Sequence, residues 1–189
     1  TVNSAMESVK EVLPGKLLFG ECSFTERVFG NRRDFDTHGQ SSTFKMLMLQ
    51  GEGGDKALLY NFGCHPTVLH EQNHFISADF PGQVASLLTQ QISELKFAMF
   101  FNGAAGDVST RFYRQKSDFD ELERIARVMA ESIAKCMANT EELVLDPNKF
   151  QTLTIPVQLK IKEMPPMNVL ENMLKQAQDE LQSAEEKGE

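Results

Sequence analysis

Three histidines fall within ten residues of one another and could bind a metal ion. They lie in the segment NFGCHPTVLHEQNHFISADFPG (61–82). They are His65, His70 and His74. Neutral imidazole is the commonest zinc ligand in proteins, because it binds at physiological pH without burying a charge. His65 is the strongest candidate ligand, since it directly follows an apolar run that predicts a strand, and strand pairing would fix its direction. The alternative for each histidine is an ordinary hydrogen-bonded residue of a polar loop.

Asp79 lies near the end of the same segment, where a helical pattern begins. A carboxylate in this position can orient a metal-bound imidazole through a hydrogen bond from its second ring nitrogen. It can also cap the helix, and Pro81 in the first turn supports that interpretation. The cap is the commoner use of an aspartate at the start of a helix.

The second candidate is the segment NGAAGDVST (102–110), which follows another short apolar run. Its small residues, 103–106, let the backbone approach a ligand closely and place amide groups around a developing oxyanion. Ser109 follows in the same loop and could attack directly or stabilise a tetrahedral intermediate by hydrogen bonding, two roles that the sequence does not separate. GDVS is not the GxSxG elbow of the hydrolases. A tight turn of small residues is the alternative. The backbone donors expected for an oxyanion are those of Gly106, Asp107 and Val108.

A third candidate is the pair Asn31 and Arg32, which lies in a long polar stretch (26–42) without sustained periodicity. The planar guanidinium of Arg32 could fork onto a substrate oxygen. The alternative is a solvated surface arginine.

The elements that must position these residues alternate between strand and helix. Apolar spacing predicts strands over 17–24, 44–49, 57–62, 97–101 and 153–161, and helices over 5–12, 79–95, 119–137 and 167–184. We therefore expect an α/β fold, with a mixed sheet, helices packed on it and active-site loops at strand ends. Residues 1–189 are expected to form one domain, with a frayed tail over 185–189. The helix at 167–184 is expected to pack on that domain, and self-association through it is the alternative.

Composition excludes some functions. The net charge is −8 and the pI is near 5.1, without the clustered basic residues that a nucleic-acid interface needs. No apolar run approaches the roughly 18 residues of a membrane span. The three cysteines, Cys22, Cys64 and Cys136, are an odd number without CxxC spacing. We therefore expect neither a disulfide framework nor a cysteine zinc site, and a cytoplasmic location is slightly favoured.

Three segments occur here in the order VFGNRRDF, NFGCHPTVLHEQNHFISADFPG and FFNGAAGDVST. Together they resemble the catalytic domain of the neutral, non-lysosomal ceramidases and their shorter bacterial relatives, up to about Pro165. The resemblance implies that His65 binds zinc and that Ser109 is required for activity. It also implies that Arg32 lies in the active site near the substrate.

The sequence also departs from this family. The other zinc ligands of the family are a histidine upstream, within a THxH-like segment, and a glutamate and a tyrosine far downstream, and no match to them lies in this chain. Most zinc ligands are therefore expected outside it. In the family the serine is typically followed by proline and asparagine, whereas Thr110 and Arg111 stand here.

The resemblance implies a zinc-dependent amide hydrolase that cleaves the N-acyl bond of a ceramide-like lipid, with an incomplete site in this chain. In that mechanism zinc polarises the carbonyl and lowers the pKa of its bound water to about 7. Two alternatives remain. One is a zinc hydrolase of a small soluble amide or ester, and the other is an inactive structural or binding fragment.

Overall fold

The computed structural model describes residues 14–24, 26–33, 43–149, 151–160 and 163–187. Its contacts divide the chain into two units, Thr1–Asp146 and Pro147–Glu189. The helix predicted over 5–12 lies outside the described residues. The first unit contains all candidate site residues.

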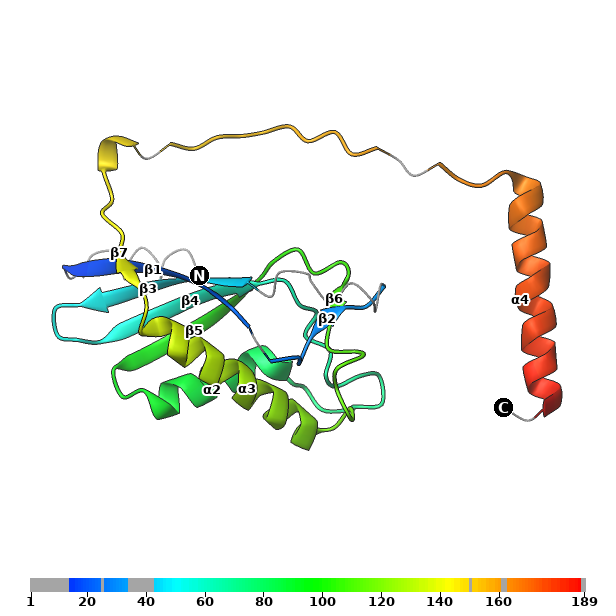
Figure 1. Cartoon of the computed structure of the whole chain (residues 1–189), viewed down its shortest axis with the longest axis horizontal. Coiled ribbons are helices and arrows are strands. Elements are labelled where there is room, and N and C mark those ends of the chain that lie inside the picture. Colours follow the sequence, from blue (N-terminus) through cyan, green and yellow to red (C-terminus); the bar gives the residue numbers. More distant parts are fainter. Residues whose placement is uncertain (1–13, 25, 34–42, 150, 161–162, 188–189) are drawn as a thin grey trace. The chain divides into compact units, whose positions relative to one another are not determined.

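A five-stranded sheet forms the centre of the first unit (Figure 1). Its strands lie in the order β5-β4-β3-β1-β7. Strands β4 and β5 pair in parallel, and the other pairs are antiparallel. A tight turn joins β3 to β4, and Gly54 adopts a φ of 89° there, which favours glycine. The strands are β1 (Gly15–Ser23), β3 (Thr43–Gly51), β4 (Lys56–Phe62), β5 (Leu95–Asn102) and β7 (Glu141–Glu142).

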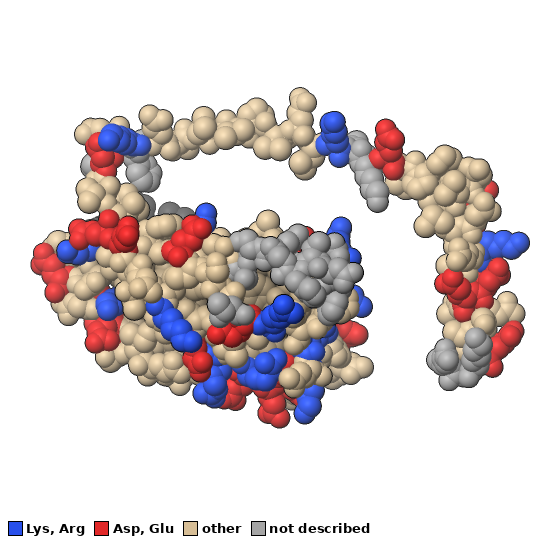
Figure 2. Space-filling model, viewed as in Figure 1, with Lys and Arg blue, Asp and Glu red and all other residues tan. Residues whose placement is uncertain are grey.

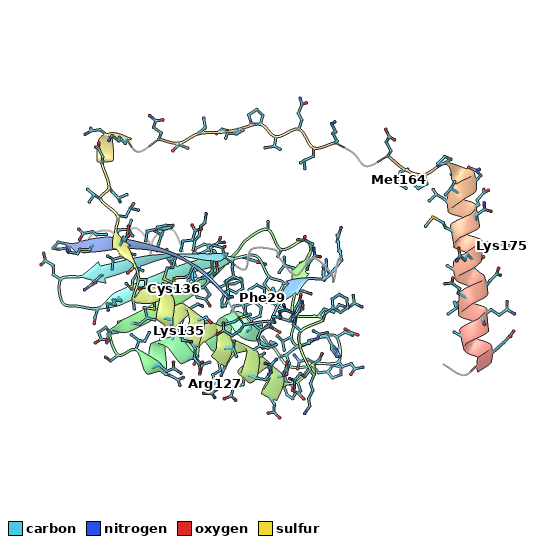
Figure 3. All side chains as sticks on the ribbon, in the orientation of Figure 1. Phe29, Arg127, Lys135, Cys136, Met164 and Lys175 are labelled. Carbon is cyan, nitrogen blue, oxygen red and sulfur yellow. A yellow bond between two sulfur atoms is a disulfide. The ribbon has the colours of Figure 1, made fainter. Side chains whose placement is uncertain are left out.

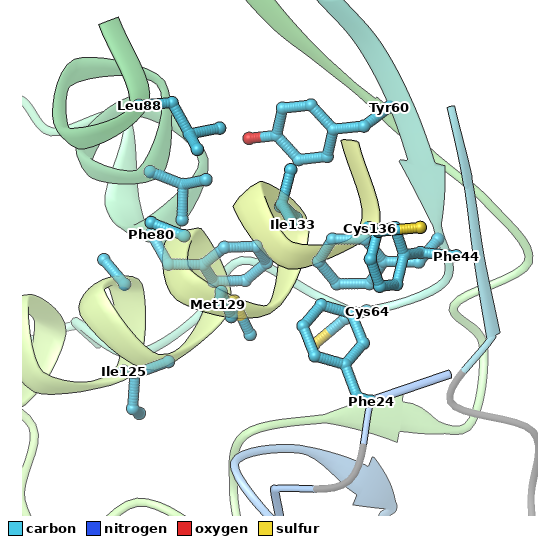
Figure 4. Close-up of a cluster of buried hydrophobic side chains, with 14 of the residues drawn as sticks. Phe24, Phe44, Tyr60, Cys64, Phe80, Leu88, Ile125, Met129, Ile133 and Cys136 are labelled. Atoms are coloured by element: carbon cyan, nitrogen blue, oxygen red, sulfur yellow. The ribbon is translucent and has the colours of Figure 1, made fainter. Parts of the chain in front are cut away.

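Two helices, α2 (Asp79–Gln91) and α3 (Phe119–Met137), lie on the same side of this sheet (Figure 1). The core forms between them and the sheet (Figure 4). Alternate residues of the strands, such as Phe44 and Tyr60, point into it because side chains alternate between the faces of a strand. The predicted mixed sheet with helices packed on it is thus confirmed. Helix residues of the core include Phe80, Leu88, Ile125, Met129 and Ile133.

The second face of the sheet is also apolar. Phe19, Leu47, Leu59 and Met99 pair in register and form a row across four strands. Phe19 at one end of this row is 38% exposed and Met99 at the other is 41% exposed. Strands with apolar residues on both faces are typical of sheets that are covered on both sides. Among the described residues, helices cover one side.

A disulfide joins Cys22 of β1 to Cys136 of α3, with the two Cα atoms 6.0 Å apart. Figure 3 labels Cys136 on its helix. The expectation of no disulfide was therefore wrong. The two cysteines are 114 residues apart in sequence, and only the packing of α3 beside β1 brings them together. The cytoplasmic location was inferred from free cysteines, and two of the three cysteines are not free, so that inference no longer holds.

The remaining cysteine, Cys64, is buried. Its burial raises the pKa of its thiol, and the negative charge of Asp79 raises it further.

The second unit contains a 3₁₀ turn at Pro147–Lys149 and helix α4 (Met167–Lys187). The strand predicted over 153–161 is wrong for its described residues, since 153–160 pair with no other described strand. Apolar alternation produces a strand only where a partner supplies backbone hydrogen bonds. Helix α4 extends to Lys187, while 188–189 lie outside the described residues, and the frayed tail over 185–189 stays a prediction. Self-association through α4 stays a prediction.

Charges are mixed on the face of the molecule shown in Figure 2, where Lys and Arg are interspersed with Asp and Glu. Within the described parts of the chain, no helix is long and apolar enough to cross a membrane.

Replacing both Cys22 and Cys136 by serine is expected to lower the free energy of unfolding by about 4 to 5 kcal/mol, because the bond closes a loop of more than a hundred residues. Urea unfolding of the two proteins measures the change. In the control, a reductant should destabilise the native protein and leave the double variant unchanged. Equal midpoints for the native protein with and without reductant would contradict the disulfide.

Candidate functional site

The three segments singled out in the sequence meet backbone to backbone. Strand β2 (Gly30–Asn31) pairs with β6 (Val108–Ser109) in a small second sheet. His65 joins it through a parallel bridge to Ser109, and its N–H donates to the carbonyl of Val108 at 2.9 Å. Figure 1 shows β2 and β6 together beyond the ends of the large sheet. The candidate residues of all three segments are therefore neighbours in space.

This meeting follows from the parallel pairing of β4 and β5. The carboxyl ends of parallel neighbours lie at the same edge of a sheet, so the segments that follow them emerge side by side. The N–H of Gly103 donates to the carbonyl of Phe62 at 2.9 Å, and the N–H of Cys64 donates to Asn102 Oδ1 at 3.2 Å. A Cβ atom on Gly63 would lie 2.4 Å from the carbonyl oxygen of Ala104. Glycine is therefore needed where the two segments touch.

Arg32 is clamped to the loop that precedes Ser109. Its backbone N–H donates to the carbonyl of Asp107 at 2.6 Å. Its side chain donates to the carbonyl of Gly106 through Nη2 at 3.0 Å and through Nε at 3.3 Å. These contacts hold Arg32 against the loop, and its place near a substrate stays a prediction.

Ser109 is buried, with 3% of its surface exposed, and its Oγ accepts a hydrogen bond from the backbone N–H of Arg111 at 3.2 Å. It borders an open cavity of about 670 Å³. The cavity is mainly polar and strongly charged. Its lining residues are Arg32, Thr67, Leu69, His70, Glu71, Ser109, Arg111 and Arg114.

The loop before Ser109 offers fewer backbone donors than the sequence suggested. The N–H of Val108 donates to the carbonyl of Ala105 at 3.1 Å, so it is used within the loop. The N–H groups of Gly106 and Asp107 take no backbone acceptor among the described contacts. These two groups are the better candidates for binding a developing negative charge.

Asp79 holds the segment that follows His65. Its Oδ1 accepts from the backbone N–H groups of Val68 at 3.2 Å and Phe80 at 2.8 Å, and its Oδ2 accepts from Leu69 at 3.0 Å. The residue is buried and has a φ of 51°, in the left-handed region. The N-cap of α2 is Ala78, so the interpretation of Asp79 as the N-cap was wrong. A role in orienting the imidazole of His65 stays a prediction.

The histidines do not assemble into a metal site by themselves. Among the described residues, no three His, Cys, Asp or Glu side chains come close enough to hold a metal ion. His70 is half-buried, and its Nδ1 accepts from the N–H of Gln72 at 3.3 Å, while His74 is exposed. Zinc in proteins takes three or four side-chain ligands. The described residues therefore do not fit a complete zinc site, and His65 stays the one ligand that we predict.

Two site residues were missed in the sequence, Arg111 and Arg114, which line the cavity from the turn after Ser109. The N–H groups of Tyr113 and Arg114 donate to the carbonyl of Thr110 at 2.9 and 2.8 Å, which closes this turn. Arginines three residues apart within such a turn lie on the same side. The spacing of Arg111 and Arg114 could have indicated that both line one site, but only if the turn between them had been predicted.

No protein-family model matches this chain, and no curated protein matches it. Solved structures do match its fold, among them two with a TM-score of 0.62 and 20% sequence identity each. One is a ceramidase complexed with C2, which covers 75% of this chain, and the other is the neutral ceramidase from Pseudomonas aeruginosa, which covers 77%. This chain spans about a quarter of the length of those proteins, 25% and 26% respectively. It therefore has the fold of part of a neutral ceramidase, as the sequence resemblance implied.

Replacing Gly63 by alanine is expected to destabilise the protein by about 1 to 3 kcal/mol, because the new methyl group would overlap the Ala104 carbonyl. Urea unfolding gives this difference. Gly53→Ala is the matched control, since a Cβ atom at Gly53 meets nothing within 4 Å. A Gly63→Ala protein as stable as the control would show that the two segments are not in contact.

Replacing Asp79 by asparagine is expected to cost about 1 to 3 kcal/mol, because a neutral amide replaces a carboxylate that accepts three backbone hydrogen bonds. Asparagine tolerates the left-handed backbone, so strain does not confuse the result. Amide hydrogen exchange should speed up at Val68 and Leu69. The control is Asp55→Asn, which removes an exposed carboxylate, and unchanged exchange in Asp79→Asn would refute the role of Asp79.

Proposed function

We propose that this chain carries part of the active site of a ceramidase-like hydrolase that cleaves an N-acyl amide. The observation that carries the proposal is the meeting of Arg32, His65 and Ser109, from three segments far apart in the sequence, through backbone contacts. Arg32 and Ser109 also line one open cavity. The shared fold with neutral ceramidases supports it.

The groups of this chain divide into three roles in the proposed reaction. Arg32 would position the substrate beside Ser109, because its clamped guanidinium lines the cavity. The N–H groups of Gly106 and Asp107 would donate to the oxyanion that forms when the amide carbonyl is attacked, a contribution of roughly 3 kcal/mol for a good donor. His65 would supply one zinc ligand, and the others would come from beyond the described residues. Bound zinc in such hydrolases supplies Lewis-acid chemistry.

We assign Ser109 the role of hydrogen-bond donor to the oxyanion. A serine that attacks needs a base within hydrogen-bond reach. In the contacts of the described residues, Ser109 Oγ meets neither a histidine nor a carboxylate, and it accepts from the N–H of Arg111. Its own proton is thus available to a substrate oxygen.

A small soluble amide is the second candidate substrate. Leu69 is the one aliphatic side chain among the residues that line the cavity, and the others are polar or charged. Such a lining favours a polar group beside the amide over a long acyl chain. The other alternative is an inactive fragment, in which the zinc ligands other than His65 are never supplied.

The test is zinc content together with hydrolysis of a short-chain fluorescent ceramide and of a small acyl amide. Both are measured on this chain and on any longer native polypeptide that contains it. His65→Ala should abolish zinc binding, and Ser109→Ala should lower kcat about a hundredfold, as expected for one oxyanion donor. The exposed His74→Ala is the control and should retain both. If the His65→Ala protein kept the zinc content and the activity of the native protein, His65 would not be a zinc ligand.

A further inference from the structure

The cavity beside Ser109 has the opposite sign of charge to the rest of the protein. The chain carries 27 acidic and 19 basic side chains, a net charge of −8. The cavity lining, in contrast, holds three arginines, Arg32, Arg111 and Arg114, against one carboxylate, Glu71. A concave site lined by one sign of charge concentrates ligands of the other sign. The cavity is therefore suited to an anion.

Among the described residues, the three guanidinium groups have no carboxylate partner. Two arginines outside the cavity have carboxylate partners, since Arg124 pairs with Glu121 and Arg127 pairs with Glu123. No described carboxylate lies within ion-pair distance of any arginine in the cavity. Glu71, the one acidic lining residue, is 3.6 Å from Nδ1 of His70. Positive charge in the cavity is left for a ligand.

The turn that presents two of these arginines is held in place before any ligand arrives. Arg114 Nη1 donates to the backbone carbonyls of Thr67 and Val68, which leaves other donors of its five N–H groups for a ligand. At the far end of the turn, the buried carboxylate of Glu121 accepts from the N–H of Gln115 at 2.9 Å. The hydrogen bonds from Arg124 hold the pKa of Glu121 below its usual value. A preorganised arginine loses less freedom when it binds, which favours affinity.

We propose that this cavity binds an N-acyl substrate whose amine half carries a carboxylate or a phosphate, which Arg111 and Arg114 hold beside Ser109. A guanidinium group can donate two parallel hydrogen bonds to two oxygens of a carboxylate or of a phosphate. The volume of about 670 Å³ leaves room for an amide as well as the anion. The amide in this statement rests on the proposed function, whereas binding of the anion does not.

The test is calorimetric titration of the full chain with four probes, which are inorganic phosphate, N-acetylglycine, the phosphate ester of N-acetylethanolamine and neutral N-acetylethanolamine. We expect at least one anionic amide to bind tenfold or more tightly than the neutral one. Arg111→Gln and Arg114→Gln should each weaken it at least tenfold. Arg127→Gln removes an exposed arginine outside the cavity and should leave binding unchanged. The carboxylate and phosphate arms identify which anion is preferred.

Equal binding of neutral and anionic amides would overturn the proposal, as would equal weakening by Arg127→Gln. Arg111 is exposed, so its variant keeps the test valid even where loss of the Arg114 contacts unfolds the turn, which circular dichroism would detect. Specific anion binding, with no hydrolysis of any amide by a longer native polypeptide that contains this chain and binds zinc, would remove the proposed function and support the anion site. Hydrolysis of neutral and anionic amides with the same KM, unchanged in Arg111→Gln, would remove the anion site alone.

Discussion

The parallel pairing of β4 and β5 is the constraint on which the rest of this structure depends. It puts the ends of two strands at one edge of the sheet, where Gly63 and Gly103 let their following segments touch. Helix α2 must then connect the two strands across one face, which begins the core. Without this pairing, His65 and Ser109 would have no reason to be neighbours.

A second principle is that the site is fixed by backbone groups more than by side chains. The bridge between His65 and Ser109 and the pairing of β2 with β6 use main-chain hydrogen bonds. Even Arg32 and Asp79 act on backbone groups, the first as donor to carbonyls and the second as acceptor from amides. Main-chain partners hold one geometry, so side chains placed on them reach the cavity from defined directions.

The sequence predicted those features whose cause is local. Apolar periodicity predicted β3, β4 and α2 within a few residues and α3 with both of its ends, because period two and period 3.6 are set by backbone geometry. It failed where the cause lies in another part of the chain. The partner of Cys22 is 114 residues away, and a two-residue strand such as β6 has no period to detect. The same holds for 153–160, where alternation was present without a described partner strand.

The site therefore has two parts, which are a paired backbone and a turn that displays charged side chains. Main-chain pairing holds His65, Ser109 and Arg32, so these positions follow from a fold that neutral ceramidases share. The turn that carries Arg111 and Arg114 is closed by hydrogen bonds to Thr110, and Arg114 ties it to the segment that follows His65. A fold does not determine a substrate, which depends on the groups displayed around the reacting atoms. In the anion site that we propose, the charges on this turn are the groups that would select the substrate.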